Sequence, residues 1–304
     1  MDPLTPALLL IVSLLIGVIL QFVRAFPDNS YLVLNQYVIY VALPAVGLIH
    51  IPEIEIQADL LYPVASAWII FFMAIILINL IGRWLKWTRQ TIGCIILTGG
   101  LGNTLFIGYP VAEALFGQEG LSIALLMDQS GSFVIVSTLG VVVAGLYAAG
   151  KTQKRAMLRQ VVTFPPFIVF ILAILMNTAG ISVDGMILDV LDVFAETLTP
   201  VALISVGMKL KFRQSGDILQ PLFVGLTYKL LIAPAILYVI YVLLTGGEGV
   251  AVQASIIQAA TPSNITGSIL AATYGLNPRL ASQMIGIGIP VSALTITLWY
   301  MFIT

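Results

Sequence analysis

Residues able to bind a small solute gather in two apolar stretches that glycine and proline interrupt. The first stretch, 99–110, holds four glycines and a proline, and the second, 259–268, holds a proline and a glycine among small polar residues. Proline removes a helical hydrogen bond and glycine is a poor helix former, so each stretch predicts a break in a helix. The freed backbone amides and helix ends, together with polar side chains, can hold a small ligand. The predicted binding residues are Asn103, Thr104, Pro110, Pro262, Ser263, Asn264 and Thr266.

Each break can also be interpreted as a simple proline kink. Its small polar residues would then satisfy backbone groups or pack against neighbouring helices. Irregular backbone at membrane depth, however, persists only inside protein or beside water. Because the two breaks occur at corresponding places in the sequence, we expect them to face each other in the interior and to form a site.

Lys229 is an ionisable residue inside an apolar stretch, 218–244, and not in a loop. It lies about eleven residues into that stretch, and a rise of about 1.5 Å per residue places it roughly 16 Å deep. An ionisable residue at such a depth is a candidate for function. Lys229 could attract an anionic substrate. Alternatively it could pair with a helix carbonyl or an acid, or extend toward the cytoplasmic surface.

Asp128 is the second such residue, about eight residues, or roughly 12 Å, into its own apolar stretch. Burial favours the protonated form of a carboxyl group, so Asp128 is a candidate for carrying a coupling proton. The neighbouring Gln129, Ser130 and Ser132 would also suit a sodium site. Alternatively Asp128 is a buried hydrogen-bonding anchor, and a direct pair with Lys229 is a further option.

The composition requires lipid as the solvent of this chain. Of 304 residues, 60% are hydrophobic and 9% are charged, whereas soluble domains carry about 25% charged residues. One cysteine and one histidine exclude an internal disulfide, a cysteine or histidine metal cluster and histidine-based catalysis. No basic tract suggests nucleic acid, and no phosphate-binding loop suggests ATP as the driving force. We therefore expect a membrane protein that is not an enzyme and has no cofactor.

Ten predicted membrane-spanning helices must position these residues. A run of about 20 apolar residues crosses a bilayer as a helix. Of the 13 basic residues, 12 fall in loops on one side of the ten-span arrangement, and basic residues mark the cytoplasmic side. This predicts a multi-pass protein of the plasma membrane with both termini outside. The predicted spans are 4–23, 31–50, 61–82, 90–112, 120–148, 161–179, 187–208, 218–244, 249–273 and 280–303.

The two halves of the sequence repeat their landmarks. Pro44 and Pro200 are 156 residues apart, and Pro63 and Pro221 are 158 residues apart. Five spans per half is an odd number, so the second half must enter the membrane from the opposite side. We predict an all-α fold of two inverted five-helix repeats with breaks in helices 4 and 9, an arrangement that places the solute site near the midplane. The predicted division is 1–149 for the first repeat, 150–160 for a cytoplasmic linker and 161–304 for the second repeat.

Six segments carry a resemblance to a known family. Residues 103–110 read N-T-L-F-I-G-Y-P, and three further segments, at 258–262, 274–278 and 289–297, read Q-A-A-T-P, Y-G-L-N-P and I-P-V-S-A-L-T-I-T. The last two, at 205–208 and 229–234, read S-V-G-M and K-L-L-I-A-P. All six resemble segments of the auxin efflux carrier family, which includes plant PIN auxin carriers and prokaryotic carboxylate permeases. The likeness extends over the whole chain in order.

The resemblance implies a scaffold and a mobile transport domain, with the fourth and ninth helices crossing at their breaks as in bile acid/sodium symporters. It implies that Asn103 helps to hold a substrate carboxylate, and that scaffold helices form a homodimer. Two departures separate this sequence from the plant members. The connection 150–160 is short, and Asn264 stands where plant carriers usually have an apolar residue, which argues against auxin itself as the substrate.

These observations predict a secondary transporter that moves a small organic anion, a carboxylate by the resemblance, through alternating access. Coupling to H⁺, to Na⁺ or to neither is left open by the sequence. The alternatives are a non-transporting membrane sensor and an ion channel. A sensor would normally carry a signalling domain, and a channel usually places its filter on the axis of an oligomer.

Overall fold

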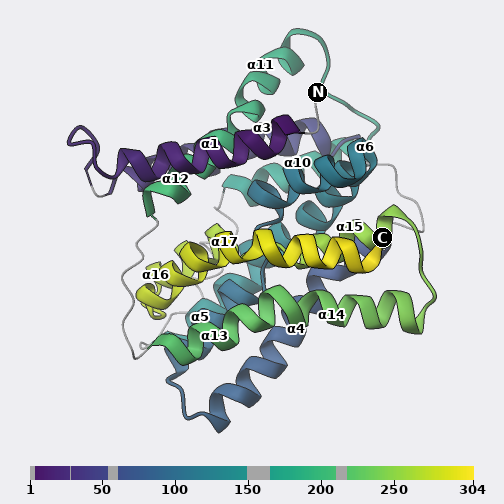
Figure 1. The fold of residues 1–304 in the computed structure, drawn as a ribbon. Coiled ribbons are helices and arrows are strands. Elements are labelled where there is room, and N and C mark those ends of the chain that lie inside the picture. The colour runs from purple at the N-terminus through teal and green to yellow at the C-terminus, as the bar shows by residue number, and fades with distance from the viewer. Residues whose placement is uncertain (1–3, 28, 54–60, 149–164, 210–217) are drawn as a thin grey trace. The chain divides into compact units, whose positions relative to one another are not determined.

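The regular structure of the described residues is helical, with one isolated antiparallel bridge (Figure 1). The computed structural model describes residues 4–27, 29–53, 61–148, 165–209 and 218–304. The chain divides into two compact units, which we call unit 1 (Met1–Gln57 and Leu158–Lys209) and unit 2 (Ala58–Met157 and Leu210–Thr304). Each unit therefore combines a segment from the first half of the sequence with one from the second half.

Unit 1 is held together by close packing of its first and last helices. A β-carbon at Gly17 would lie 2.1 Å from the backbone oxygen of Ile204, and one at Gly207 would lie 2.3 Å from that of Leu14. Both positions must be glycine, because small residues let two helix backbones approach closely. The helices of unit 1 are α1 (Leu4–Leu20), α2 (Ser30–Tyr37), η1 (Val38–Ala42), α3 (Leu43–His50), α10 (Pro165–Thr178), α11 (Gly185–Glu196) and α12 (Leu198–Lys209), where η marks a π-helical turn.

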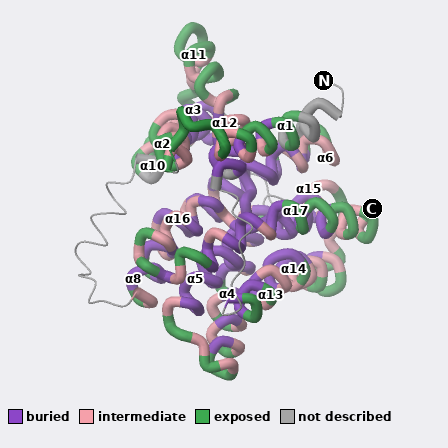
Figure 2. The backbone as a smooth tube through the Cα atoms, turned by 60° about the vertical axis from the view of Figure 1, so that its left-hand side comes forward, coloured by how far each residue is buried: buried purple, intermediate pink, exposed green. Residues whose placement is uncertain are grey.

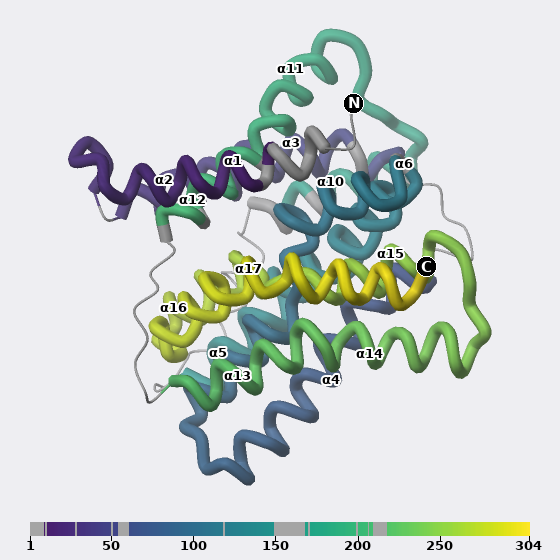
Figure 3. The backbone as a smooth tube through the Cα atoms, viewed as in Figure 1, coloured from purple at the N-terminus to yellow at the C-terminus, as the bar shows by residue number. Residues whose placement is uncertain are grey.

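Unit 2 contains both predicted helix breaks and both intramembrane ionisable residues. Several of its helices follow one another without a gap and form longer helical runs (Figure 3). Its helices are α4 (Leu61–Trp84), α5 (Arg89–Gly99), η3 (Thr104–Gly108), α6 (Tyr109–Met127), η4 (Asp128–Ser132), α7 (Phe133–Ile135), η5 (Val136–Gly140), α8 (Val141–Tyr147), α13 (Leu219–Thr227), η7 (Tyr228–Ile232), α14 (Ala233–Tyr238), η8 (Val239–Leu244), α15 (Val250–Ala259), α16 (Ile265–Thr273) and α17 (Pro278–Ile303).

Five helical runs in the described part of the chain are long and apolar enough to cross a membrane. They match five predicted spans and confirm an all-α protein of membrane-spanning composition. Three further apolar helices are shorter, so the arrangement of ten spans as two inverted repeats stays a prediction. The five long runs are Ser30–Ile49, Leu61–Trp84, Glu119–Tyr147, Leu219–Leu244 and Pro278–Ile303, and the shorter helices are Ile11–Leu20, Thr104–Gly117 and Val250–Ala259.

Two predicted spans differ in detail from the structure. The span expected at 187–208 is divided into α11 and α12 at Thr197, whose hydroxyl donates a 2.6 Å hydrogen bond to the backbone oxygen of Phe194. The span expected to end at 112 continues to Gly117, where φ is 65°. Glycine adopts this left-handed conformation without steric cost, so the chain bends there. The predicted linker 150–160 lies outside the described residues.

Helix α5 is buried over most of its length within unit 2. All residues from Thr91 to Gly99 are buried, as the purple tube in Figure 2 indicates. Thr88 caps its N-terminus by accepting a 3.2 Å hydrogen bond from the backbone N–H of Thr91. At its C-terminus, a β-carbon at Gly100 would lie 2.9 Å from the side chain of Ala74 on α4. The absence of a side chain at Gly100 therefore lets the end of α5 lie against α4 at the site described below.

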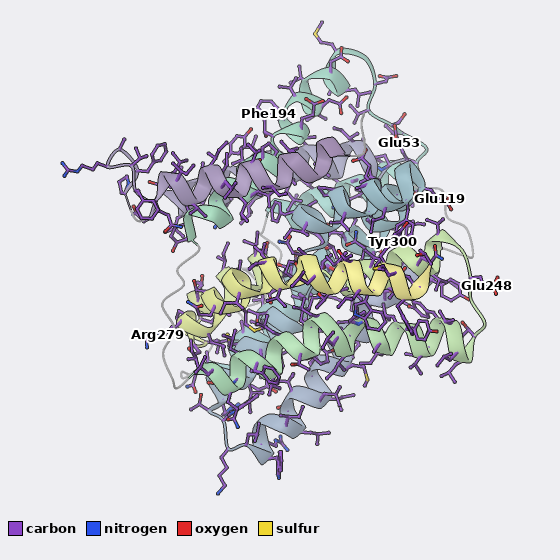
Figure 4. All side chains as sticks on the ribbon, viewed as in Figure 1. Glu53, Glu119, Phe194, Glu248, Arg279 and Tyr300 are labelled. Atoms are coloured by element: carbon purple, nitrogen blue, oxygen red, sulfur yellow. The ribbon has the colours of Figure 1, made fainter. Side chains whose placement is uncertain are left out.

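Arg279 and two acidic residues of unit 2 lie toward opposite ends of α17. Arg279 lies at the start of α17, whereas Glu119 and Glu248 lie beyond the opposite end of that helix (Figure 4). The position of Arg279 agrees with the sequence, which assigns the basic loops to one membrane face. The orientation of the chain across the membrane stays a prediction.

Candidate functional site

The two helix breaks meet within unit 2. The backbone N–H of Asn103 donates a 2.7 Å hydrogen bond to the oxygen of Pro262, and that of Asn264 donates a 3.0 Å hydrogen bond to the oxygen of Leu101. Gly102 and Ser263 form an antiparallel bridge between them. The prediction that the breaks face each other is thereby confirmed. We call residues 101–104 and 261–264, joined by these bonds, the crossing.

The first break leaves one side-chain donor of Asn103 without a protein partner. Helix α5 ends at Gly99, and the next helical turn starts at Thr104 with Asn103 as its N-cap. The Oδ1 atom of Asn103 accepts a 3.2 Å hydrogen bond from the backbone N–H of Phe106, as an N-cap should. Its Nδ2 atom is buried and has no partner among the described residues. Asn103 therefore has both a structural role and a donor that a ligand could use.

At the second break, both the side-chain oxygen and the side-chain nitrogen of Asn264 make hydrogen bonds. Asn264 caps α16 by accepting a 2.8 Å hydrogen bond from the N–H of Gly267. Its Nδ2 atom donates a 2.8 Å hydrogen bond across the crossing to the oxygen of Gly102. Asn264 thus braces the two breaks against each other. Its predicted role in binding substrate stays a prediction, and its structural role is one that the sequence did not reveal.

The ammonium group of Lys229 lies at the C-terminal end of α15, the helix that precedes the second break. Its Nζ atom donates a 2.6 Å hydrogen bond to the oxygen of Ala259, the last residue of α15. The prediction that Lys229 pairs with a helix carbonyl is confirmed. Its side chain is fully buried, and a β-carbon at Gly102 would lie only 3.1 Å from Nζ. The ammonium group therefore lies against the first break as well as the second.

Lys229 is carried by a π-helical turn, η7, and makes a single hydrogen bond to the described residues. An ammonium group has three donors, so two of them have no acceptor in this part of the chain. Such π-helical turns frequently occur at functional sites. The free donors of Lys229 and Asn103 thus occur in one region of unit 2.

Asp128 is anchored by three neutral donors. One carboxylate oxygen accepts a hydrogen bond from the hydroxyl of Thr104, and the other accepts from the hydroxyl of Tyr109 at 3.1 Å and from Nε2 of Gln129 at 3.2 Å. The described residues contain no ion pair between Asp128 and Lys229. The interpretation of Asp128 as a buried hydrogen-bonding anchor is confirmed, and its role in coupling stays a prediction. Thr104 connects this carboxylate to Asn103, the next residue along the chain.

Of the remaining predicted binding residues, Pro262 and Ser263 belong to the crossing and are buried, whereas Pro110 and Thr266 lie in the helices that follow the two breaks. Pro110 occupies the second position of α6 and is buried, and Thr266 lies half-buried in the first turn of α16. Ser263 is fully buried, and its Oγ atom has no partner among the described residues. Contact of these residues with a substrate stays a prediction. The residues described here contain no cluster of three His, Cys, Asp or Glu side chains that could hold a metal ion.

Gln258 is a polar residue of the site that the sequence reasoning missed as a binding candidate. It lies in the last turn of α15, is fully buried, and leaves both Nε2 and Oε1 without a partner among the described residues. The large majority of buried polar atoms in proteins are hydrogen-bonded. A glutamine in an apolar helix one turn before a break was the available signal.

Comparison with known proteins places the chain among transporters. A family model described as "Membrane transport protein" matches residues 4–300. The chain is 27% identical to an uncharacterised transporter of Methanocaldococcus jannaschii, with 98% of each chain covered. It is 26% identical to an uncharacterised transporter of Methanothermobacter thermautotrophicus, with 95% of this chain and 94% of that one covered.

Proposed function

Since this chain belongs to the membrane transport protein family, the family of the auxin efflux carriers, we propose that it is a secondary carrier of a small organic anion. The proposed substrate is a carboxylate, which binds at the crossing in unit 2. Alternating access would then expose the crossing to each side of the membrane in turn. Membership of the family supports transport, and the chemistry of the crossing supports the charge of the substrate.

The balance of charges and hydrogen-bond donors at the crossing is the observation that supports an anion. Two N–H donors of Lys229 and the Nδ2 donor of Asn103 are buried without acceptors among the described residues. The carboxylate of Asp128, in contrast, already accepts three hydrogen bonds. A buried donor without an acceptor is costly, and a buried cation is more so. A carboxylate would supply the acceptors and the opposite charge together.

Asp128 is our candidate for coupling transport to protons. A protonated carboxyl group gains a donor and loses acceptor capacity, so its bonds with Thr104 and Tyr109 must change when it titrates. Because Thr104 adjoins Asn103, that change would reach the substrate position directly. Oxygen atoms around Asp128 would also suit Na⁺, and the experiment below separates the two ions.

We further propose the membrane arrangement predicted from the sequence. It comprises ten spans as two inverted repeats, 1–149 and 161–304, in the plasma membrane with both termini outside. The composition of the two units supports this proposal, since each unit draws on both halves of the chain. A homodimer through scaffold helices is proposed from the family resemblance.

Reconstitution in liposomes tests the proposed function. Capacitive currents would be recorded after rapid jumps of acetate, propionate, lactate, succinate and indole-3-acetate, with neutral solutes as controls, at several pH values with and without Na⁺. We expect saturable currents for one or more carboxylates in the parent protein and their loss in Asn103→Ala.

Asn79→Ala is the matched control for that variant. Asn79 also lies in unit 2, but its amide donates to the oxygen of Ile75 on its own helix and accepts from Tyr147. We expect its currents to equal those of the parent. Currents that fail to saturate would indicate a channel. Symport of one H⁺ with a monocarboxylate carries no net charge, so uptake of radiolabelled carboxylate is measured beside the currents. The absence of both current and uptake from monodisperse protein would contradict an organic-anion carrier and favour the sensor.

A further inference from the structure

Gln258 presents an amide whose donor and acceptor are both available. Its side chain is fully buried at the end of α15, and neither Nε2 nor Oε1 has a partner among the described residues. The backbone oxygen of Gln258, in contrast, accepts a 2.6 Å hydrogen bond from the hydroxyl of Thr261 and a 3.2 Å bond from its N–H. The backbone at Gln258 is therefore fixed by the turn that forms the second break, while its amide group makes no hydrogen bond to the residues that the structure describes.

The amide of Gln258 lies directly on the helical turn that follows Asn103. A β-carbon at Gly108 would lie 2.0 Å from Oε1, 2.7 Å from Cδ and 2.8 Å from Nε2 of Gln258. Gly108 in turn donates a 3.0 Å hydrogen bond from its N–H to the oxygen of Asn103. The missing side chain at Gly108 thus makes room for the amide. Asn103 and Gln258 contact opposite ends of the same π-helical turn.

A purely structural glutamine on this helix behaves differently. Gln253 lies about 1.4 turns earlier in α15 at 3.6 residues per turn. It is half-buried and donates a 3.2 Å hydrogen bond from Nε2 to the oxygen of Ile303. It thereby ties α15 to the end of α17. Gln258 makes no such connection, although it is more deeply buried. Packing therefore explains Gln253 and does not explain the amide of Gln258.

We infer that Gln258 determines specificity by binding a second polar group of the transported anion, one that both donates and accepts a hydrogen bond. A hydroxyl group has this property, and one amide can satisfy both of its functions. The inference rests on the proposed function, since it assumes that a carboxylate binds beside Asn103 and Lys229. The site then prefers a hydroxylated anion over an unsubstituted anion of the same charge and length.

The preference for a hydroxylated anion arises because an anion without a hydroxyl leaves the amide of Gln258 unpaired. An unsubstituted anion with an apolar tail would leave Nε2 and Oε1 of Gln258 unpaired in the occupied site. Sites that hydrogen-bond a hydroxyl reject analogues that lack it, because their buried polar groups remain unpaired. We expect the half-saturating concentration of the hydroxylated anion to be lower by about tenfold.

Two solute pairs of equal charge test the inference in reconstituted liposomes. Lactate is compared with propionate, and glycolate with acetate, in the parent protein, Gln258→Leu and the control Gln253→Leu. We expect the parent and Gln253→Leu to prefer the hydroxylated member of each pair about tenfold. Gln258→Leu is expected to transport both members with similar half-saturating concentrations.

Gly108→Ala provides a second route to the same result without changing the amide. The added β-carbon cannot coexist with Oε1 at 2.0 Å, so the amide must move. We expect this variant to lose the hydroxyl preference as Gln258→Leu does. If either variant fails to fold, binding is measured on the detergent-solubilised parent protein instead. The shift of its melting temperature with each solute then compares the hydroxylated and unsubstituted anions.

The outcomes separate this inference from the function on which it rests. Carboxylate currents without a hydroxyl preference in the parent, or with the preference retained in Gln258→Leu, would overturn the inference and leave the anion carrier standing. A parent protein that neither transports nor binds any carboxylate would overturn both.

Discussion

The two helix breaks of unit 2 use the same capping residue in different ways. Asn103 and Asn264 each cap the half-helix that follows their break through Oδ1. The Nδ2 atom of Asn264 is consumed by a 2.8 Å hydrogen bond to Gly102, whereas that of Asn103 has no partner among the described residues. The second break therefore holds the crossing together, and the first break leaves a donor that a ligand could use. Two N-cap asparagines at matching breaks thus differ in their hydrogen bonds.

The breaks also differ in the charged group to which each is hydrogen-bonded. The first break is linked through Thr104 to the carboxylate of Asp128, and the second is linked through Ala259 to the ammonium of Lys229. That ammonium also lies against Gly102 of the first break, and the described structure has no ion pair between Asp128 and Lys229. An anionic substrate would be attracted to the side of Lys229, and its binding would depend on the protonation of Asp128.

Removal of the positive charge is expected to have the largest effect. Lys229→Met keeps the length of the side chain and removes the ammonium, which no acid among the described residues neutralises. We expect carboxylate transport to fall by about 100-fold, because truncating one partner of a buried charge pair costs about 2–5 kcal/mol. Initial rates of carboxylate uptake into liposomes measure the effect.

The control for Lys229→Met is Arg83→Met, which changes an exposed basic residue at the end of α4 in unit 2. It is expected to leave the uptake rate within about twofold of the parent, as surface substitutions usually do. Normal uptake by Lys229→Met would contradict a role for the ammonium in anion binding.

Exchange of amide for carboxylate at the two caps sharpens the comparison between the breaks. Aspartate preserves the Oδ1 acceptor of an N-cap and removes the Nδ2 donor. We expect Asn103→Asp to lower transport by about tenfold or more with a melting temperature near that of the parent, since only the ligand loses a donor. We expect Asn264→Asp to lower stability by about 1–3 kcal/mol, since the oxygen of Gly102 loses its donor and faces a carboxylate.

Paired transport and thermal-unfolding measurements on the two variants test this expectation. The reverse pattern, with Asn103→Asp unstable and Asn264→Asp stable but inactive, would assign the ligand to the second break. Equal effects of both substitutions would contradict the division of roles.

Replacement of the buried acid tests the link from the first break to coupling. Asp128→Asn retains an acceptor for Thr104 and removes the titrating group. If transport is proton-coupled, parent currents fall as the pH rises, because Asp128 then carries no proton, and currents of Asp128→Asn are independent of pH. Currents recorded across a pH series at fixed carboxylate concentration measure this. Identical pH profiles in the two proteins would exclude Asp128 as the coupling residue, and a loss of Na⁺ dependence alone would assign it to Na⁺.

The hydroxyl of Ser263 is expected to have the smallest effect. Its Oγ atom is buried at the crossing and has no partner among the described residues, so Ser263→Ala removes no bond from the protein. We expect stability to be unchanged or slightly raised and transport to fall about two- to fivefold. Ser255→Ala, which removes a 2.7 Å hydrogen bond to the oxygen of Ala251 on the same helix, is the control and should leave transport unchanged. A transport rate of Ser263→Ala equal to that of the parent would remove Ser263 from the site.

The helix breaks and their meeting could be predicted from the sequence, because glycine, proline and small polar residues have local effects on the backbone. The burial of Asp128 and Lys229 within long apolar helical runs could also be predicted, from the distance of each residue to the ends of its run. The sequence also allowed Lys229 to pair with a helix carbonyl as one of several alternatives, and the structure shows that bond to the oxygen of Ala259.

The partners of individual side chains could not be predicted, since they depend on how separate helices pack. Asn103 and Asn264 have the same local sequence role, and only the approach of Gly102 distinguishes them. Gln258 and Gln253 are both glutamines in one apolar helix, and only the position of Gly108 shows which amide lacks a partner. The π-helical turns that carry Asp128 and Lys229 have no recognised sequence signal.

A crystal structure of the protein with 3-bromopropionate would test the central proposal most directly. The bromine provides an anomalous signal that locates the carboxylate independently of transport. Binding at the crossing predicts a bromine peak in unit 2 with the carboxylate in hydrogen-bonding contact with Nδ2 of Asn103 and Nζ of Lys229, and no such peak in crystals of Lys229→Met. A bromine peak elsewhere in the chain, with the crossing unoccupied in a protein that transports the compound, would contradict it.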